Sequence, residues 1–143
     1  MSNGKYNRIQ CSIAKVYKIT VQSLSGMLEE VYAAKETIKK WNEAIAESAG
    51  KLYMLVDDAQ SANVLLGIIG NRLENHELVD ESLKDGKLVL LLFNEYAGPK
   101  NTIVSEQNAV ALFKESIRNR CIWFDYNGVS YFGSLIEKQL NEL

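Results

Sequence analysis

The sequence predicts an α/β fold, a three-layer sandwich around a doubly wound, mostly parallel sheet of four or five strands. Two apolar runs, residues 62–69 and 88–93, are continuous rather than alternating in hydrophobicity. Continuous runs of this kind are typical of strands that helices cover on both faces. Between them, an amphipathic segment places Leu78, Val79 and Leu83 on one face. The order indicates one complete β-loop-α-β unit.

The amino-terminal half of the domain begins with a strand and a long helix. Residues 13–21 are rich in β-branched and aromatic side chains, which favours a strand. A helix is expected from about Ser25 to about Ala49, with Gly50 as its stop. Its buried stripe follows steps of three and four: Met27, Val31, Ala34, Ile38, Trp41 and Ile45.

Residues 51–60 fit two interpretations, because Leu52 and Leu55 suit a short strand as well as one face of a helix. If residues 52–56 and 62–69 were both parallel strands of one sheet, five residues would have to make the crossover between them. Such a crossover ordinarily takes about a dozen residues. We therefore expect a second short helix here, with an antiparallel edge strand as the alternative.

The carboxyl-terminal third continues the alternation of strands and helices. A loop at residues 96–104 precedes a helix that extends to about residue 119, and residues 121–124 form a last strand. Asn127 and Gly128 are compatible with a hairpin, but the apolar spacing that follows favours a terminal helix. The whole order is that of a flavodoxin-like, Rossmann-like domain.

Composition and charge exclude several classes of function. With 143 residues, the chain has the length of one domain, expected at residues 13–143 after a flexible segment at residues 1–12. A net charge of −2 and a sequence pI near 5.5 give no reason to expect nucleic acid as a partner. There is no signal-peptide-like apolar region and no run of about 20 apolar residues, which predicts a cytoplasmic protein without membrane contact.

Metal binding is not expected. Cys11 and Cys121 lack metal-ligand spacing, and His76 is the single histidine, so a His-based cluster cannot be built. Two cysteines so far apart are expected to behave as small apolar residues in a reducing compartment rather than as a disulfide.

Three stretches carry a resemblance to a known family. A charged helix ends in a Trp-Asn pair in LEEVYAAKETIKKWN. The central part reads DDAQSANVLLGIIGNRL, ELVDESLKDGK and LVLLLF, and an aromatic strand ends at Asp125 and Tyr126. Over residues 15–140 the chain is similar to small TIR-like and nucleoside 2-deoxyribosyltransferase-like domains of bacterial defence and signalling proteins. The relatives' second strand and following helix are abbreviated here to residues 50–61.

The resemblance implies a nucleotide- or nucleoside-binding domain related to enzymes that cleave N-glycosyl bonds. The ligand would be NAD or a nucleoside as substrate, with no cofactor. In catalytic relatives a glutamate at the start of the acidic helix attacks or stabilises the anomeric carbon, and Glu77 is the nearest candidate. Aligning on Gly86 and Lys87 puts Leu78 there in some versions of the pattern. The alternative function is a non-catalytic TIR-like interaction or oligomerisation module.

Further candidate residues lie near the predicted carboxyl ends of the strands, where ligands of such sheets bind. Arg72 is placed to pair with a phosphate, or alternatively with Glu74 in a surface salt bridge. His76 is a candidate helper of the catalytic acid, and the alternative is a histidine in a solvated helix start. Tyr96 is placed to cover a base. Ser23 is expected beside the same crevice, unless it only caps a helix.

Self-association is also expected. The apparent lack of a second strand leaves one side of the sheet open, and an exposed edge or apolar stripe invites a second copy. We therefore expect a homo-oligomer.

Overall fold

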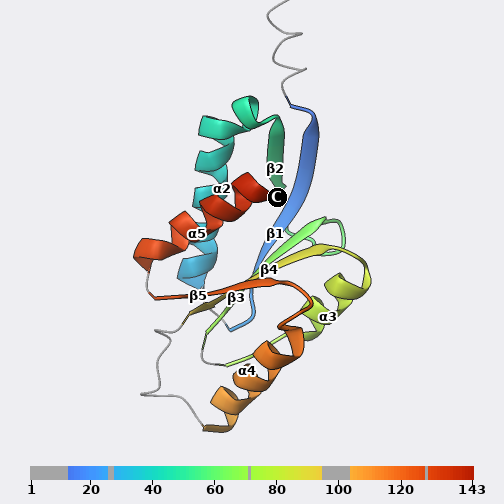
Figure 1. The fold of residues 1–143 in the computed structure, drawn as a ribbon, viewed down its shortest axis with the longest axis vertical. Coiled ribbons are helices and arrows are strands. Elements are labelled where there is room, and N and C mark those ends of the chain that lie inside the picture. The colour runs from blue at the N-terminus through green and yellow to red at the C-terminus, as the bar shows by residue number, and fades with distance from the viewer. Residues whose placement is uncertain (1–12, 26–27, 71, 95–103, 128) are drawn as a thin grey trace, which may run out of the picture.

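The computed structural model describes residues 13–25, 28–70, 72–94, 104–127 and 129–143, and Figure 1 shows the fold. The segment 1–12, expected to be flexible, lies outside these residues. In chain order the elements are β1 (Lys15–Ser23), α2 (Leu28–Ala49), β2 (Lys51–Leu55), β3 (Val64–Ile69), α3 (Glu77–Lys84), β4 (Leu88–Asn94), α4 (Val104–Ile117), β5 (Ile122–Tyr126) and α5 (Val129–Glu142).

The five strands form one all-parallel sheet in the order β2-β1-β3-β4-β5, so the predicted fold class is confirmed. The two central apolar runs are neighbours in it, with Val64 opposite Leu88 and Ile69 opposite Phe93. α2 and α5 lie on one face of the sheet, and α3 and α4 lie on the other (Figure 1). The terminal helix is also as predicted, since α5 begins at Val129.

Alternate residues of the central strands supply two cores, one on each face, as a doubly covered sheet requires. The core beneath α2 and α5 contains Ile19, Val64, Leu66, Ile68 and Leu90 from the sheet, with Ile38, Trp41, Phe132 and Ile136 from the helices. The core beneath α3 and α4 contains Leu65, Ile69, Val89, Leu91 and Phe93 from the sheet, with Val79, Phe113 and Ile117 from the helices.

The short helix expected at residues 51–60 does not form, and the antiparallel alternative is also wrong. Lys51–Leu55 is a parallel edge strand, β2, paired with β1. The helix α2 ends at Ala49, and Gly50 follows with a φ of 74°, a left-handed conformation that glycine adopts without strain. The second strand of the fold is therefore present, and the element missing from this connection is a helix after it.

A stagger between β2 and β3 explains how so short a connection is possible. β2 pairs with the first half of β1 and β3 with the second half, so that Ile19 lies opposite both Leu55 and Val64. The chain therefore has to pass over β1 but not to return along its length. Residues 56–63, which we call the crossover segment, make this passage. Asn63 fixes its end, because its backbone N–H donates to the carbonyl of Lys18 at 2.7 Å.

A side chain from α2 forms hydrogen bonds with the middle of the free edge of β2. Asn42 accepts a hydrogen bond from the backbone N–H of Tyr53 at 3.0 Å and donates to its carbonyl at 2.7 Å. One amide thus satisfies both edge-facing backbone groups of Tyr53, the middle residue of this strand. The neighbouring Trp41 donates from its indole N–H to Asn141 in α5 at 2.9 Å. The Trp-Asn pair therefore joins three elements: α2, β2 and α5.

Replacing Asn42 with alanine is expected to lower the free energy of unfolding by about 1–3 kcal/mol, since two partly buried backbone groups lose their partner. Urea unfolding followed by circular dichroism measures the change. Glu43→Ala is the matched control, because its side chain is exposed on the same helix and should stay within about 0.5 kcal/mol of wild type. Equal stabilities of the two variants would contradict the role given to Asn42.

Candidate functional site

The loops after β1 and β3 are tied together at the carboxyl edge of the sheet, where the chain order reverses between these two strands. The hydroxyl of Ser25 accepts a hydrogen bond from the N–H of Gly70 at 2.7 Å and donates to the carbonyl of Arg72. The carbonyl of Leu24 accepts from the N–H of Glu74 at 2.6 Å. Parallel sheets bind ligands at such a reversal. These hydrogen bonds hold the two loops in a fixed position relative to each other.

A left-handed residue directs the chain from this loop into α3. Asn75 has a φ of 54°, a conformation that asparagine tolerates better than most residues. His76 follows, with no side-chain capping bond, and its ring lies edge-on to that of Phe113 with the centroids 6.2 Å apart. α3 then begins at Glu77. The turn brings the helix start beside the crossover segment.

A depression of about 400 Å³ lies between the crossover segment and α3. The polar and charged residues that line it are Gln22, Asp57, Asp58, Asn75, Glu77 and Glu81. Gln22 is the second-last residue of β1, and Asp57 and Asp58 come just after β2. The depression is therefore built from the carboxyl ends of β1 and β2 and from the first turn of α3.

Hydrogen bonds from two side chains hold the wall of this depression that the crossover segment forms. The amide nitrogen of Gln22 donates to the hydroxyl of Thr20 at 2.7 Å and to the carbonyl of Asp57 at 3.2 Å. The ammonium of Lys87 donates to the carbonyls of Ala59 and Gln60 at 2.5 and 3.1 Å. Within the crossover segment, the N–H groups of Ser61 and Ala62 donate to the carbonyls of Asp58 and Ala59 at 3.2 and 3.3 Å, and the bonds from Gln22 and Lys87 tie this turn to the rest of the domain.

The lining of the depression is negatively charged. It contains four carboxylates, from Asp57, Asp58, Glu77 and Glu81, and no lysine or arginine. A cation approaches from outside, since the Lys35 ammonium lies 3.9 Å from the carboxylate of Asp57. A second depression of about 460 Å³ shares Ala59, Leu78 and Glu81 with the first and continues along α3. The surface therefore favours hydroxyl donors and positive charge over phosphate.

The predicted site residues are only partly brought together. Glu77 lines the depression with its side chain 69% exposed, and its carboxylate lies 3.9 Å from His76 Nδ1. Arg72 pairs with Glu74 at 3.1 Å, which is the alternative weighed for it. The hydroxyl of Ser23 accepts from the N–H of Ser25 at 3.3 Å, a local bond within its own turn. Tyr96 lies outside the described residues.

Sequence reasoning missed three lining residues: Gln22, Asp57 and Asp58. The two aspartates were assigned to a helix with the rest of residues 51–60, so they were not considered as ligand-binding groups. A usable signal was present, because two adjacent acids directly after an apolar strand lie at the carboxyl edge of a parallel sheet. Recognising β2 as parallel was the missing step.

The opposite edge of the sheet carries a different depression, of about 340 Å³, beside the amino ends of β4 and β5. Cys121 lines it as a free thiol, and burial raises its pKa to about 11, with the charge of Arg120 partly opposing the rise. A thiol with a raised pKa is a poor nucleophile. Arg120 pairs with Asp80 at 3.6 Å. Among the described residues that line this depression, Cys121 is therefore not an activated nucleophile, and the carboxylates that could take part in catalysis lie at the carboxyl edge of the sheet.

No group of three or more His, Cys, Asp or Glu residues in the described ranges is placed to hold a metal ion. No described helix has both the length and the apolar character that crossing a membrane requires.

Comparison with known proteins adds little to this geometry. No family model matches the chain, and no curated protein matches it. Among solved structures, homoserine dehydrogenase of S. aureus at pH 7.0 is similar, with 12% identity and a TM-score of 0.45. The same enzyme at pH 6.0 gives 12% identity and a TM-score of 0.46. Each match covers 79% of this chain but 33% of the dehydrogenase, so it assigns no activity here.

Proposed function

We propose that this chain is a nucleoside- or nucleotide-binding α/β domain related to enzymes that cleave N-glycosyl bonds, acting in bacterial defence or signalling. The observation that carries the proposal is the position of Glu77. It lines a depression at the carboxyl edge of the sheet together with Gln22 and Asp57. This edge is where doubly wound domains bind their ligands.

The chemistry of the lining supports the sugar of a nucleoside as the bound group. Carboxylates accept hydrogen bonds from sugar hydroxyls, and the amides of Gln22 and Asn75 can donate as well as accept. A volume of about 400 Å³ falls within the range of small-molecule sites. A carboxylate beside the anomeric carbon also suits cleavage of the N-glycosyl bond, because positive charge develops on the sugar in the transition state.

The negative charge of the lining determines which part of a nucleotide binds in the depression. Four carboxylates repel a phosphate group but attract a cationic nucleoside such as nicotinamide riboside, the positively charged part of NAD. We therefore place the sugar and base in the depression, and any phosphate outside it. Because the carboxylates are exposed to water, each contact is weak and the affinity is modest.

Ligand-observed NMR at low salt tests this proposal. Nicotinamide riboside is expected to bind more tightly than adenosine, and adenosine more tightly than its 5′-monophosphate. Asp57→Asn with Glu77→Gln should remove the preference for the cationic nucleoside. Glu115→Gln is the matched control, since this exposed glutamate lies on α4 and pairs with Arg118. Tightest binding of the monophosphate would contradict the proposal.

A second candidate function, the non-catalytic interaction module, is favoured by a different observation. Val16 and Met54 are 50% and 45% exposed on a face of the sheet that no described helix covers. Exposed apolar surface of this kind marks a protein–protein contact. Absence of nucleoside binding together with a stable complex would favour this module over the ligand site.

A further inference from the structure

On one face of the sheet, no described helix covers β2 and the first half of β1. Side chains alternate along a strand, so Val16 and Lys18 point away from the face on which Tyr17 stacks against Tyr53 with ring centroids 5.2 Å apart. The parallel register places Val16 opposite Leu52 and Lys18 opposite Met54. We call these four residues the open patch.

The missing helix after β2 explains why the open patch exists. On this side of the sheet, α3 packs on β3 and β4, and α4 contributes Phe113 and Ile117 to the same core. The crossover segment covers only the second half of β1, where Thr20 is 1% exposed. Figure 1 shows no helix beside the first half of β1 on the side away from α2 and α5. Leu52 is partly buried and packs against the core beneath α2 and α5, whereas Val16 and Met54 are 50% and 45% exposed.

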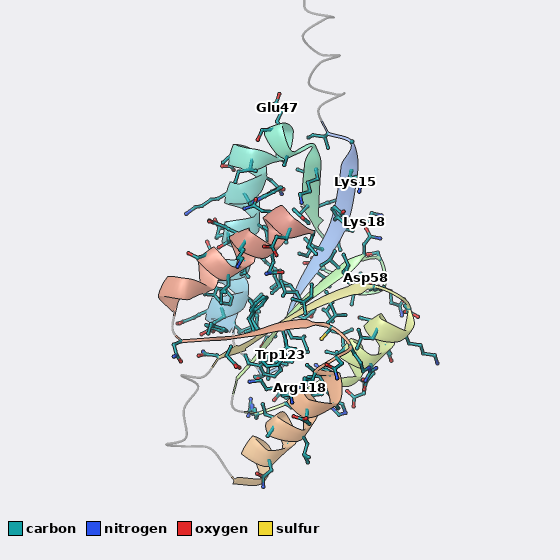
Figure 2. All side chains as sticks on the ribbon, viewed as in Figure 1. Lys15, Lys18, Glu47, Asp58, Arg118 and Trp123 are labelled. Carbon is teal, nitrogen blue, oxygen red and sulfur yellow. The ribbon has the colours of Figure 1, made fainter. Side chains whose placement is uncertain are left out.

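Charges at the rim of the open patch are self-complementary. Figure 2 shows Lys18 and Asp58 on the side of β1 away from α2 and α5. Neither has a salt-bridge partner among the described residues. In a two-fold contact the same patch meets itself, so Lys18 of each copy can face Asp58 of the other. Such an arrangement makes two equivalent ion pairs around an apolar centre.

A second copy cannot bind instead by pairing with the middle of the free edge of β2. Asn42 already occupies the N–H and carbonyl of Tyr53 in the middle of β2, so a second copy cannot extend the sheet there. A partner must approach the face.

From these observations we propose that the open patch binds a second copy of this chain, face to face, with Lys18 and Asp58 paired across a two-fold axis. The contact shares Asp58 with the lining of the ligand site proposed above, whereas Lys18 and Met54 do not line that site, so variants of these two residues test the dimer separately. Because the patch is small, the dimer is weak and forms as protein concentration rises.

Sedimentation velocity of the full chain over a range of concentrations tests the dimer. Lys18→Glu and Asp58→Lys should each raise the dissociation constant by about tenfold or more, because each sets like charges opposite one another. The double variant Lys18→Glu/Asp58→Lys should recover most of the affinity, since it exchanges the two signs. Met54→Glu should abolish dimers.

The controls change similar side chains elsewhere. Leu112→Glu alters a side chain that is 72% exposed on α4, and Lys138→Glu alters an exposed lysine on α5; both should dimerise as wild type does. Circular dichroism confirms that each variant is folded. A wild-type chain that stays monomeric overturns the proposal, even if some other protein binds the patch. A double variant no better than its two single variants also overturns it.

Discussion

Replacing Trp41 with alanine is expected to lower the free energy of unfolding by about 3–5 kcal/mol. Its ring is 2% exposed, lies edge-on to the Tyr53 ring with centroids 5.1 Å apart, and donates to Asn141 at 2.9 Å. Alanine removes a large buried ring and leaves both a cavity and an acceptor without its donor. The substitution therefore removes contacts that join three elements: α2, β2 and α5.

Two further variants separate the contributions of ring packing, the indole hydrogen bond and burial to this loss of stability. Trp41→Phe keeps a ring but lacks the N–H, and it should lose less stability than Trp41→Ala. Trp123→Ala should also lose less, because that ring is only partly buried. Urea unfolding followed by circular dichroism, rather than tryptophan fluorescence, allows all of the variants to be compared. A loss below about 1 kcal/mol for Trp41→Ala would contradict the packing described here.

Replacing Glu77 with glutamine is expected to reduce base release from nicotinamide riboside, NAD or a deoxynucleoside by about 10²–10³-fold or more. The amide keeps the size of the side chain but removes the charge that would stabilise the cationic sugar or form a bond to it. Chromatographic separation of free base from substrate measures the rate.

Glu81→Gln distinguishes a specific role of Glu77 from a general effect of charge, because both acids line the same depression. We expect a much smaller change for Glu81→Gln. If both variants lose the same activity, the negative field matters rather than one carboxylate. If neither changes the rate, Glu77 takes no part in the reaction. A wild-type chain that binds nucleosides but releases no base would limit the function to binding.

Local sequence patterns predicted the elements that are long or strongly periodic. The stripe containing Ile38 and Trp41 predicted α2, and the two continuous apolar runs predicted β3 and β4 as parallel neighbours. Burial on both faces leaves a clear trace in such runs, because every position must be apolar. The flavodoxin-like class follows from these elements alone.

The register between distant strands could not be predicted in the same way. We did not expect a parallel strand at residues 52–56, because five residues are too few for an ordinary crossover to a strand at residues 62–69. Tertiary pairing instead places Leu55 and Val64 at the same level, opposite Ile19. No local periodicity encodes such a stagger. The error hid Asp57 and Asp58, although Glu77 was identified as a candidate from the acidic helix start.

The proposed function requires that a nucleoside binds in the depression between the crossover segment and α3. Titrating the ¹⁵N-labelled chain with nicotinamide riboside and following assigned backbone amides tests this directly. We predict that the largest shifts cluster at Gln22, residues 57–59, Asn75 and Glu77. Shifts that cluster instead around Cys121 at the opposite edge, or no shifts at saturating ligand, would contradict the account.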